Sequence, residues 1–106
     1  MDIMGMMKKA QAMQAKLQEA QEELGRLEVE GSSGGGMVAI AMTAKGEVKS
    51  VRIDPSLITP ADKEILEDLI MAAFADAKGK ADRLATEKMQ ALTAGLLLPP
   101  GMKLPF

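Results

Sequence analysis

The N-terminal third of the chain alternates between apolar and polar positions with the period of a helix. Beginning at Met6, apolar residues follow one another at spacings of 4, 3, 4, 3, 4 and 3: Met6, Ala10, Met13, Leu17, Ala20, Leu24 and Leu27. This is the seam of a heptad pattern, and the Gln, Lys and Glu between these positions favour helix. The pattern predicts a long N-terminal helix whose seam packs on the protein's own core, on a partner helix, or on both.

Three short segments that follow this helix show the two-residue alternation of β-strands: 27–30, 38–42 and 47–54. In the middle segment Val38, Ile40 and Met42 fall on one face. In the last segment the apolar phase slips between Val48 and Val51, and one extra residue near 49–50, a β-bulge, would restore it. These segments predict a three-stranded antiparallel meander.

A glycine-rich segment, Gly31–Gly36, separates the first two of these strands. Gly31 and Gly36 have the spacing of a phosphate-binding loop. That loop continues with Lys and Ser or Thr, however, and this chain continues with Met37 and Val38. We therefore expect a flexible connection between strands and no nucleotide site.

A second long helix is predicted from Thr59-Pro60 to about Ala94, with Thr59 as the N-cap and Gly95 as the C-terminal stop. Its apolar stripe comprises Ile70, Phe74, Ala77, Ala81, Leu84 and Leu92. Gly79 lies inside this helix, where it predicts a kink or close packing.

Together these elements predict an α+β domain, residues 1–97, that is followed by a Pro-rich tail, residues 98–106, which cannot be helical. A helix of about 35 residues is about 52 Å long, whereas a compact chain of this size has a radius of gyration near 13 Å. The helices therefore project beyond the sheet as an arm. A three-stranded sheet also has two unprotected edges and a small core, and we expect a homodimer.

The composition removes whole classes of chemistry. The 106 residues include no Cys, His, Trp or Tyr and only two Phe. The usual proton shuttle, the thiol nucleophile and the commonest transition-metal ligands are missing, so we expect no enzyme, cofactor or metal. No apolar run approaches the roughly 18 residues of a membrane span, and the N-terminus lacks the apolar stretch of a signal peptide. We expect a cytoplasmic protein without a membrane partner.

The net charge of −2 hides a segregation of charges along both helices. Residues 3–18 carry three Lys and no acid, whereas residues 19–30 carry five Glu and one Arg. Residues 60–70 are acidic and residues 71–94 slightly basic. Because both helices join the sheet by their acidic ends, the basic halves are expected at the free end of the arm. The candidate phosphate-binding residues are Lys8, Lys9, Lys16, Lys78, Lys80, Arg83 and Lys88.

The alternative interpretation of these cations is a solvated surface whose Lys residues pair with neighbouring acids. Charge alone favours that alternative, because nucleic-acid-binding domains are usually basic overall. The chain also has few Arg and no Asn or His, which leaves a poor set of side chains for reading base edges. The scarcity of aromatic residues disfavours single-stranded binding by stacking.

Four segments give the chain a family resemblance: MKKAQAMQ (7–14), LEVEG (27–31), VRIDPSL (51–57) and LPPGMKLPF (98–106). In these it resembles the YbaB/EbfC family of bacterial nucleoid-associated proteins. The resemblance implies a small α+β protein that dimerises into a tweezers shape, binds double-stranded DNA with weak sequence preference and associates with the nucleoid. It also implies a link to recombination and repair proteins.

The resemblance transfers to individual residues only in the helices. Lys8 and Lys16 match basic positions of the family's first helix. Lys78, Lys80, Arg83 and Lys88 fall in the basic stretch of its long helix, in which Gly79 replaces a residue that is often basic. The leading hypothesis is a dimeric, nucleoid-associated protein that contacts DNA phosphates with little base readout. The alternative is a protein-interaction module linked to repair or recombination, in which DNA contact is incidental.

Overall fold

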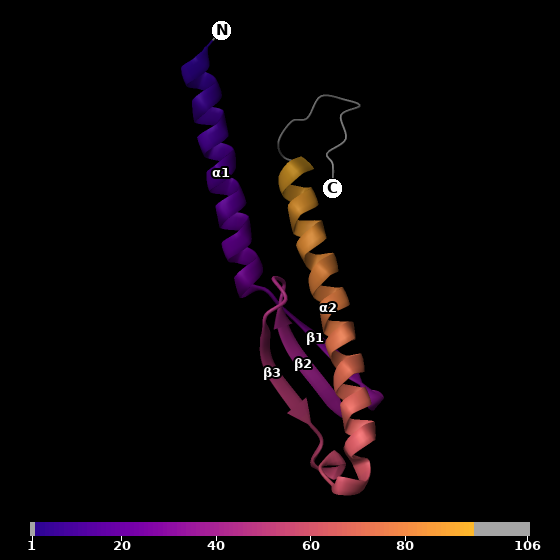
Figure 1. The fold of residues 1–106 in the computed structure, drawn as a ribbon. Helices are drawn as coiled ribbons and strands as arrows, with labels where there is room; N and C mark the ends of the chain where they lie inside the picture. The colour runs from indigo at the N-terminus through magenta and orange to yellow at the C-terminus, as the bar shows by residue number, and fades with distance from the viewer. Residues whose placement is uncertain (1, 95–106) are drawn as a thin grey trace.

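The computed structural model describes residues 2–94 and confirms the predicted order of elements (Figure 1). The helices are α1 (Ile3–Arg26) and α2 (Lys63–Ala94), and the strands are β1 (Glu28–Ser33), β2 (Val38–Thr43) and β3 (Val48–Ile53). Short 3₁₀ turns occupy Gly34–Gly36, Pro55–Leu57 and Pro60–Asp62. The predicted helix stop at Gly95 and the predicted tail, residues 98–106, lie outside the described residues.

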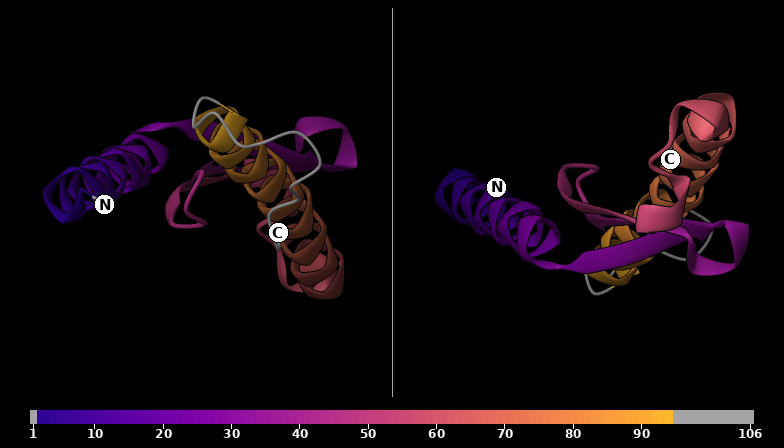
Figure 2. Two further views of the ribbon diagram at one scale, coloured as in Figure 1. Left: turned by 90° about the horizontal axis from the view of Figure 1, so that it is seen from above. Right: turned by 90° about the horizontal axis from the view of Figure 1, so that it is seen from below.

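The molecule is elongated, with extents of 72 × 25 × 16 Å and a radius of gyration of 19.9 Å. The predicted projection of the helices beyond the sheet is therefore confirmed. Figure 2 shows that α1 leaves the sheet to one side of α2, and α1 packs on α2 only near its C-terminal end, where Leu24 is buried. Residues 6–16 of α1 are all exposed.

The predicted meander is confirmed in its strand order, in the apolar face of β2 and in the β-bulge of β3. The strand order is β1-β2-β3 and both pairings are antiparallel. Ala41 pairs with Ser50 and Met42 pairs with Val48, so Lys49 is the extra residue of a β-bulge. Beyond this bulge the apolar residues of β3 return to the face of β2 that α2 covers.

The core lies between β2, β1 and the middle of α2. Val38, Ile40 and Met42 of β2 pack against a stripe of small residues on the helix, Ala73, Ala77 and Ala81, which are 0 % exposed. Because alanine side chains are short, the backbones of helix and sheet approach each other closely. An all-aliphatic core of this kind fits a chain with so few aromatic residues.

The prediction that Gly31–Gly36 is a flexible connection is wrong for its first half. Residues 31–33 belong to β1, and Gly31 pairs with Ile40 directly beneath α2. A Cβ atom built on Gly31 would collide with the backbone nitrogen of Ala77 and lie 2.6 Å from its Cα. Gly31 is therefore required by the contact between strand and helix, and only Gly34–Gly36 form the turn, with positive φ at each residue.

The prediction of close packing at Gly79 is also wrong. A Cβ atom at Gly79 would meet nothing within 4 Å, and α2 is one helix from Lys63 to Ala94. The predicted N-cap is confirmed: the Thr59 hydroxyl accepts a hydrogen bond from the Asp62 backbone N–H at 3.3 Å. A 3₁₀ turn, Pro60–Asp62, comes between this cap and the α-helix.

We predict opposite effects of adding a methyl group at the two glycines. Gly31→Ala should lower the free energy of unfolding by about 1–3 kcal/mol, because the methyl group has backbone atoms of α2 in its way. Gly79→Ala should raise it by about 0.5–1 kcal/mol, because the site is helical and open. Urea unfolding at one fixed protein concentration measures both, and a Gly31→Ala protein as stable as the parent would contradict the close approach.

Candidate nucleic-acid interface

The outer half of α1 carries three cations, and residues 3–18 around them include no acid, although Glu19 follows Lys16 by three positions. Lys8, Lys9 and Lys16 are exposed, and none of them forms an ion pair with any residue from 2 to 94. Lys9 and Lys16 are seven residues apart, so they share one face of the helix. The predicted position of these three residues on the projecting arm is confirmed.

A cleft between the two helices brings Lys16 together with Lys88. It has a volume of about 470 Å³ and is lined by Lys16, Glu19, Ala20, Glu23, Lys88, Ala91 and Leu92. The Lys88 Nζ lies 3.3 Å from a Glu23 carboxylate oxygen, which ties α2 to α1 across the cleft. Lys88 is thus partly neutralised, and the charges of the cleft lining balance, because Lys16 and Lys88 face Glu19 and Glu23.

The sequence predicted Lys78 and Lys80 at the free end of the arm, and this prediction is wrong. The Lys80 Nζ donates a hydrogen bond to the Glu30 carbonyl oxygen of β1 at 2.9 Å, and Lys78 pairs with Asp82 at 2.6 Å. A Cβ atom on Gly46, in the β2–β3 turn, would lie 3.6 Å from the Lys78 Nζ. The long helix runs beside the sheet for more than half its length, so these two positions are still next to the strands.

Asp76 links α2 to β1 through a hydrogen bond that sequence inspection missed. Its carboxylate accepts a hydrogen bond from the Ser32 backbone N–H at 3.0 Å and pairs with the Lys80 Nζ at 3.2 Å. The Ser32 N–H is the main reason that the pKa of Asp76 lies below its ordinary value, and Lys80 and the nearby charge of Arg83 lower it further. The only sequence signal was the Asp-x-x-x-Lys spacing of 76 and 80, which is common on helix surfaces.

Arg83 is exposed on α2, one turn beyond Lys80. It forms no ion pair with the residues from 2 to 94, although its charge reaches Asp76. Its location on the sheet side of the α1–α2 contact separates it from Lys8 and Lys9. The seven candidate cations therefore form a free group on α1 and a partly paired group on α2.

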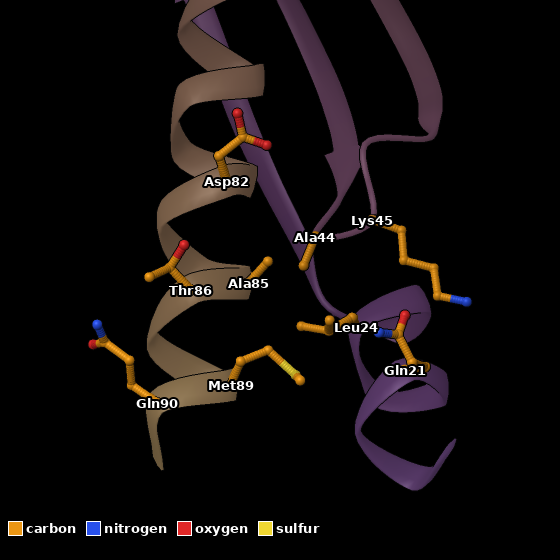
Figure 3. Close-up of a pocket in the computed structure, with 9 residues that line it drawn as sticks. All are labelled: Gln21, Leu24, Ala44, Lys45, Asp82, Ala85, Thr86, Met89 and Gln90. Atoms are coloured by element: carbon orange, nitrogen blue, oxygen red, sulfur yellow. The ribbon is translucent and has the colours of Figure 1, made fainter. Parts of the chain in front are cut away.

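A second concavity, of about 490 Å³, lies where three elements meet (Figure 3). Leu24 from α1, Ala44 from the β2–β3 turn, and Ala85 and Met89 from α2 supply its apolar walls. Gln21, Lys45, Asp82, Thr86 and Gln90 form its rim. These residues come from distant parts of the chain, so no sequence pattern identified the group.

The described part of the chain offers no constellation for metal chemistry. Among residues 2–94, no three His, Cys, Asp or Glu side chains gather as a ligand set. Within the same residues, no helix is both long enough and apolar enough to cross a membrane. Exposed cations and an extended shape remain the chemical features to explain.

Comparison with known proteins gives consistent matches over nearly the whole chain. Residues 1–96 match the model of the YbaB/EbfC DNA-binding family. A nucleoid-associated protein of Methylocella silvestris is 60% identical over 105 residues, which cover 99% of this chain and 98% of the relative. A nucleoid-associated protein of Rhizobium meliloti is 56% identical with the same coverage. These names describe DNA-binding and nucleoid-associated proteins and no known class of enzyme.

The fold also matches a solved structure. The crystal structure of an uncharacterized protein from Helicobacter pylori superimposes with a TM-score of 0.71 at 26% sequence identity. The match covers 92% of this chain and 99% of that one. The order of helices and strands is therefore shared at low sequence identity.

We predict that Asp76→Asn weakens the fold in a pH-dependent way. Because the folded state lowers the pKa of Asp76, its charge contributes stability above the ordinary pKa of about 3.9, and this contribution is lost as the pH falls through the lower folded-state value. The variant should be less stable than the parent at pH 7, and the difference should shrink below pH 4. Urea unfolding at pH 7, 4 and 2.5 measures this.

Asp82→Asn is the matched control for this experiment. Asp82 pairs with Lys78 on the same helix but makes no hydrogen bond to a strand in the described structure. It should therefore change stability less than Asp76→Asn at pH 7. A stability difference for Asp76→Asn that stays constant from pH 7 to 2.5 would show that its charge does not anchor β1.

Proposed function

Because this chain belongs to the YbaB/EbfC DNA-binding family, we propose that it is a nucleoid-associated protein of the bacterial cytoplasm that binds double-stranded DNA as a homodimer. In this proposal binding depends mainly on phosphate contacts, with little readout of bases. The single observation that carries the proposed mechanism is the group of unpaired lysines on the projecting half of α1, in a protein whose net charge is negative.

Lys8, Lys9 and Lys16 are the proposed primary contacts with phosphate. Their side chains are exposed and have no ion pairs to break within the described structure, so they can bind DNA without giving up another partner. Lysine is a flexible point charge that suits phosphates without selecting a base. The N-terminal turn of α1 is already capped by the Asp2 carboxylate, which accepts from the Gly5 N–H at 3.0 Å. The attraction for a phosphate group therefore comes from the lysine side chains more than from the N-terminus of the helix.

The four candidates on α2 contribute less in this proposal. Lys88 lies in the cleft with Lys16 and can turn toward a phosphate by giving up Glu23, an exposed pair of small energetic value. Arg83 lies farther along α2 and meets DNA only if the duplex passes along the arm. Lys80 is held beside the sheet by Asp76 and the Glu30 carbonyl, which favours a structural role, and Lys78 is paired with Asp82 on the same helix.

The proposed dimer surface is the part of the sheet that α2 leaves uncovered. Val48 and Val51 pair with Met42 and Ile40, so they lie on the face of the sheet that carries the core. They are nevertheless 46% and 47% exposed, because α2 crosses β1 and β2. Phe74 stands four residues before Lys78, on the side of α2 that faces the β2–β3 turn, and it is also exposed.

A second copy of the chain covers this apolar surface and protects the open edge of β3. A sheet edge with an adjoining apolar face is a site where another chain pairs or packs. With the sheets joined in this way, each copy contributes one arm, and the two arms can lie on either side of a duplex. This arrangement would explain how a small acidic protein holds DNA: the acids stay near the sheet and the free lysines stay on the arms.

We predict that Val51→Asp weakens the dimer. Burying a carboxylate without a partner is unfavourable, so the dimer dissociation constant should rise at least ten-fold, about 1.4 kcal/mol. Ile65→Asp is the matched control, because Ile65 is similarly exposed but belongs to α2 and not to the sheet. Light scattering over a micromolar concentration series measures the effect, and a parent protein that is monomeric throughout would refute the proposed dimer.

We predict that Lys9→Gln with Lys16→Gln lowers the affinity for duplex DNA by about ten-fold at ~0.1 M salt, equally for unrelated sequences. The slope of log affinity against log salt should become shallower by about 0.9 for each phosphate that the variant no longer neutralises. The control is Lys49→Gln with Lys63→Gln, which removes the same charge from exposed positions outside α1 and should change affinity less than three-fold. Gel-shift titrations at two salt concentrations provide the measurement.

Equal reductions in affinity in the two double variants would mean that net charge, and not the arm, controls binding. Unchanged affinity in a folded Lys9→Gln, Lys16→Gln protein would place the DNA contact elsewhere. That second result would favour the alternative function, a module that binds repair or recombination proteins.

A further inference from the structure

We propose that two side chains of α2, Asp76 and Lys80, close the β1 edge of the sheet against pairing with another chain. An edge strand carries backbone N–H and C=O groups that point away from the sheet, and a strand of a second molecule can bind to them. On β1 the Ser32 N–H donates to the Asp76 carboxylate at 3.0 Å, and the Glu30 carbonyl accepts from the Lys80 Nζ at 2.9 Å. The two side chains of α2 thus take the place of a fourth strand.

The backbone groups that Asp76 and Lys80 bind are the ones that point outward from β1. The Leu27 carbonyl, just before β1, accepts a hydrogen bond from the Ala44 N–H, so the backbone of Leu27 faces β2. Because successive residues of a strand direct their backbone groups to opposite sides, Glu30 and Ser32 face away from β2. A strand added across this position would need the Glu30 carbonyl and the Ser32 N–H, and both already have partners.

The spacing of the two side chains on α2 matches the spacing of the two residues on β1. Asp76 and Lys80 are four residues apart, which is about 6 Å of helix at ~1.5 Å per residue. Glu30 and Ser32 are two residues apart, which is about 6.6 Å of strand at ~3.3 Å per residue. The Lys80 Nζ also lies 3.2 Å from an Asp76 carboxylate oxygen, so the two side chains form one unit that holds both backbone groups.

Gly31 makes this reach possible. It lies between the two bonded residues of β1, and its missing side chain lets the α2 backbone at Ala77 approach the strand. Asp76 comes one residue before Ala77 and Lys80 three residues after it, so both side chains start close to β1. In the strand order β1-β2-β3 the two edges are β1 and β3, and α2 lies over β1 and β2 (Figure 1). Asp76 and Lys80 therefore act at one edge of the sheet and not at the other.

Closing one edge limits how copies of the chain can associate. A sheet with two open edges can add a strand on each side, and contacts of that kind continue into open filaments when they do not close into a ring. With β1 closed, another sheet can pair only at β3, so the association stops. The inference goes beyond the proposed dimer and does not need it, because opening β1 should enlarge the assembly whether the parent is a monomer or a dimer.

The test is the assembly size of a double variant of the full chain, Asp76→Ala with Lys80→Ala, measured by light scattering over a micromolar concentration series. The matched control is Lys78→Ala with Asp82→Ala, which removes a second Asp–Lys pair of the same spacing on α2. In the described structure that control pair makes no hydrogen bond to a strand. Both pairs are partly exposed and alanine favours helix, so both proteins should fold.

The mean mass of the Asp76→Ala, Lys80→Ala protein should rise with concentration to at least about twice that of the parent, because a second edge becomes available. The control should keep the mass of the parent. Equal masses for all three proteins would overturn the proposal, since the two side chains would then only anchor α2 to β1. Equal growth of both variants would also overturn it.

Adding Ser32→Pro to the Asp76→Ala, Lys80→Ala protein separates edge pairing from damage to the fold. Proline has no N–H, and an edge strand tolerates it where that N–H would point outward. The third change should return the mean mass to that of the parent, although it restores no contact between α2 and β1. A triple variant as large as the double variant would contradict the proposal, because the association would then not use the Ser32 N–H.

Amide hydrogen exchange at Ser32 gives a second measurement, which begins with the parent. There the Ser32 N–H should exchange at least about ten-fold more slowly than in an unstructured peptide of the same sequence, because Asp76 accepts its hydrogen bond. At the lowest protein concentration the Asp76→Ala, Lys80→Ala change should remove this protection and leave exchange in β2 the same. A parent whose Ser32 N–H exchanges as in the free peptide would refute the closed edge, whether or not the double variant folds.

Discussion

The structure depends on the close approach of one strand to one helix. Gly31 of β1 lies directly against the backbone of α2 at Ala77, and no side chain fits between them. The small residues Ala73, Ala77 and Ala81 continue the same contact along the helix. In a chain with two phenylalanines and no tryptophan, large side chains cannot fill a thick layer, and the core forms its contacts by bringing backbones together.

This contact determines where the rest of the molecule lies. Because α2 is fixed over β1 and β2, the core face of β3 is left open at Val48 and Val51. The hydrogen bond from Ser32 to Asp76 and that from Lys80 to the Glu30 carbonyl fix the helix along the strand direction. As a result α2 extends past the sheet, and α1 packs on it only near the C-terminal end of α1. The outer half of α1 therefore projects alone, and its lysines form no ion pair with the described residues. The surface proposed for a second copy and the surface proposed for DNA both follow from one packing contact.

The electrostatic arrangement has the same origin. A lysine that reaches a strand becomes part of the fold through an ion pair and a backbone hydrogen bond, as Lys80 shows. Lysines of equal intrinsic charge that lie beyond the sheet remain available for an external anion, as Lys9 and Lys16 do. A negative net charge is therefore compatible with a local cationic stretch, because residues 3–18 carry three lysines and no acid, and the acids of α1 begin only at Glu19.

The sequence by itself determined the elements, because their signals are local. The heptad seam predicted α1, the slipped alternation between Val48 and Val51 predicted the bulge at Lys49, and Thr59 predicted the entry to α2. The lysines of α1 were also recognisable as a cationic stretch, since residues 3–18 contain no acid. Only the tertiary structure decided the roles of Gly31 and Gly79, which the sequence suggested in reverse, and the positions of Lys78 and Lys80. The physical reason is that the role of a glycine or a lysine depends on what lies opposite it. Gly31 faces the backbone of α2, Lys80 faces β1 and Lys78 faces the β2–β3 turn, each between about 30 and 50 residues away in the chain, whereas a side chain at Gly79 would face open space.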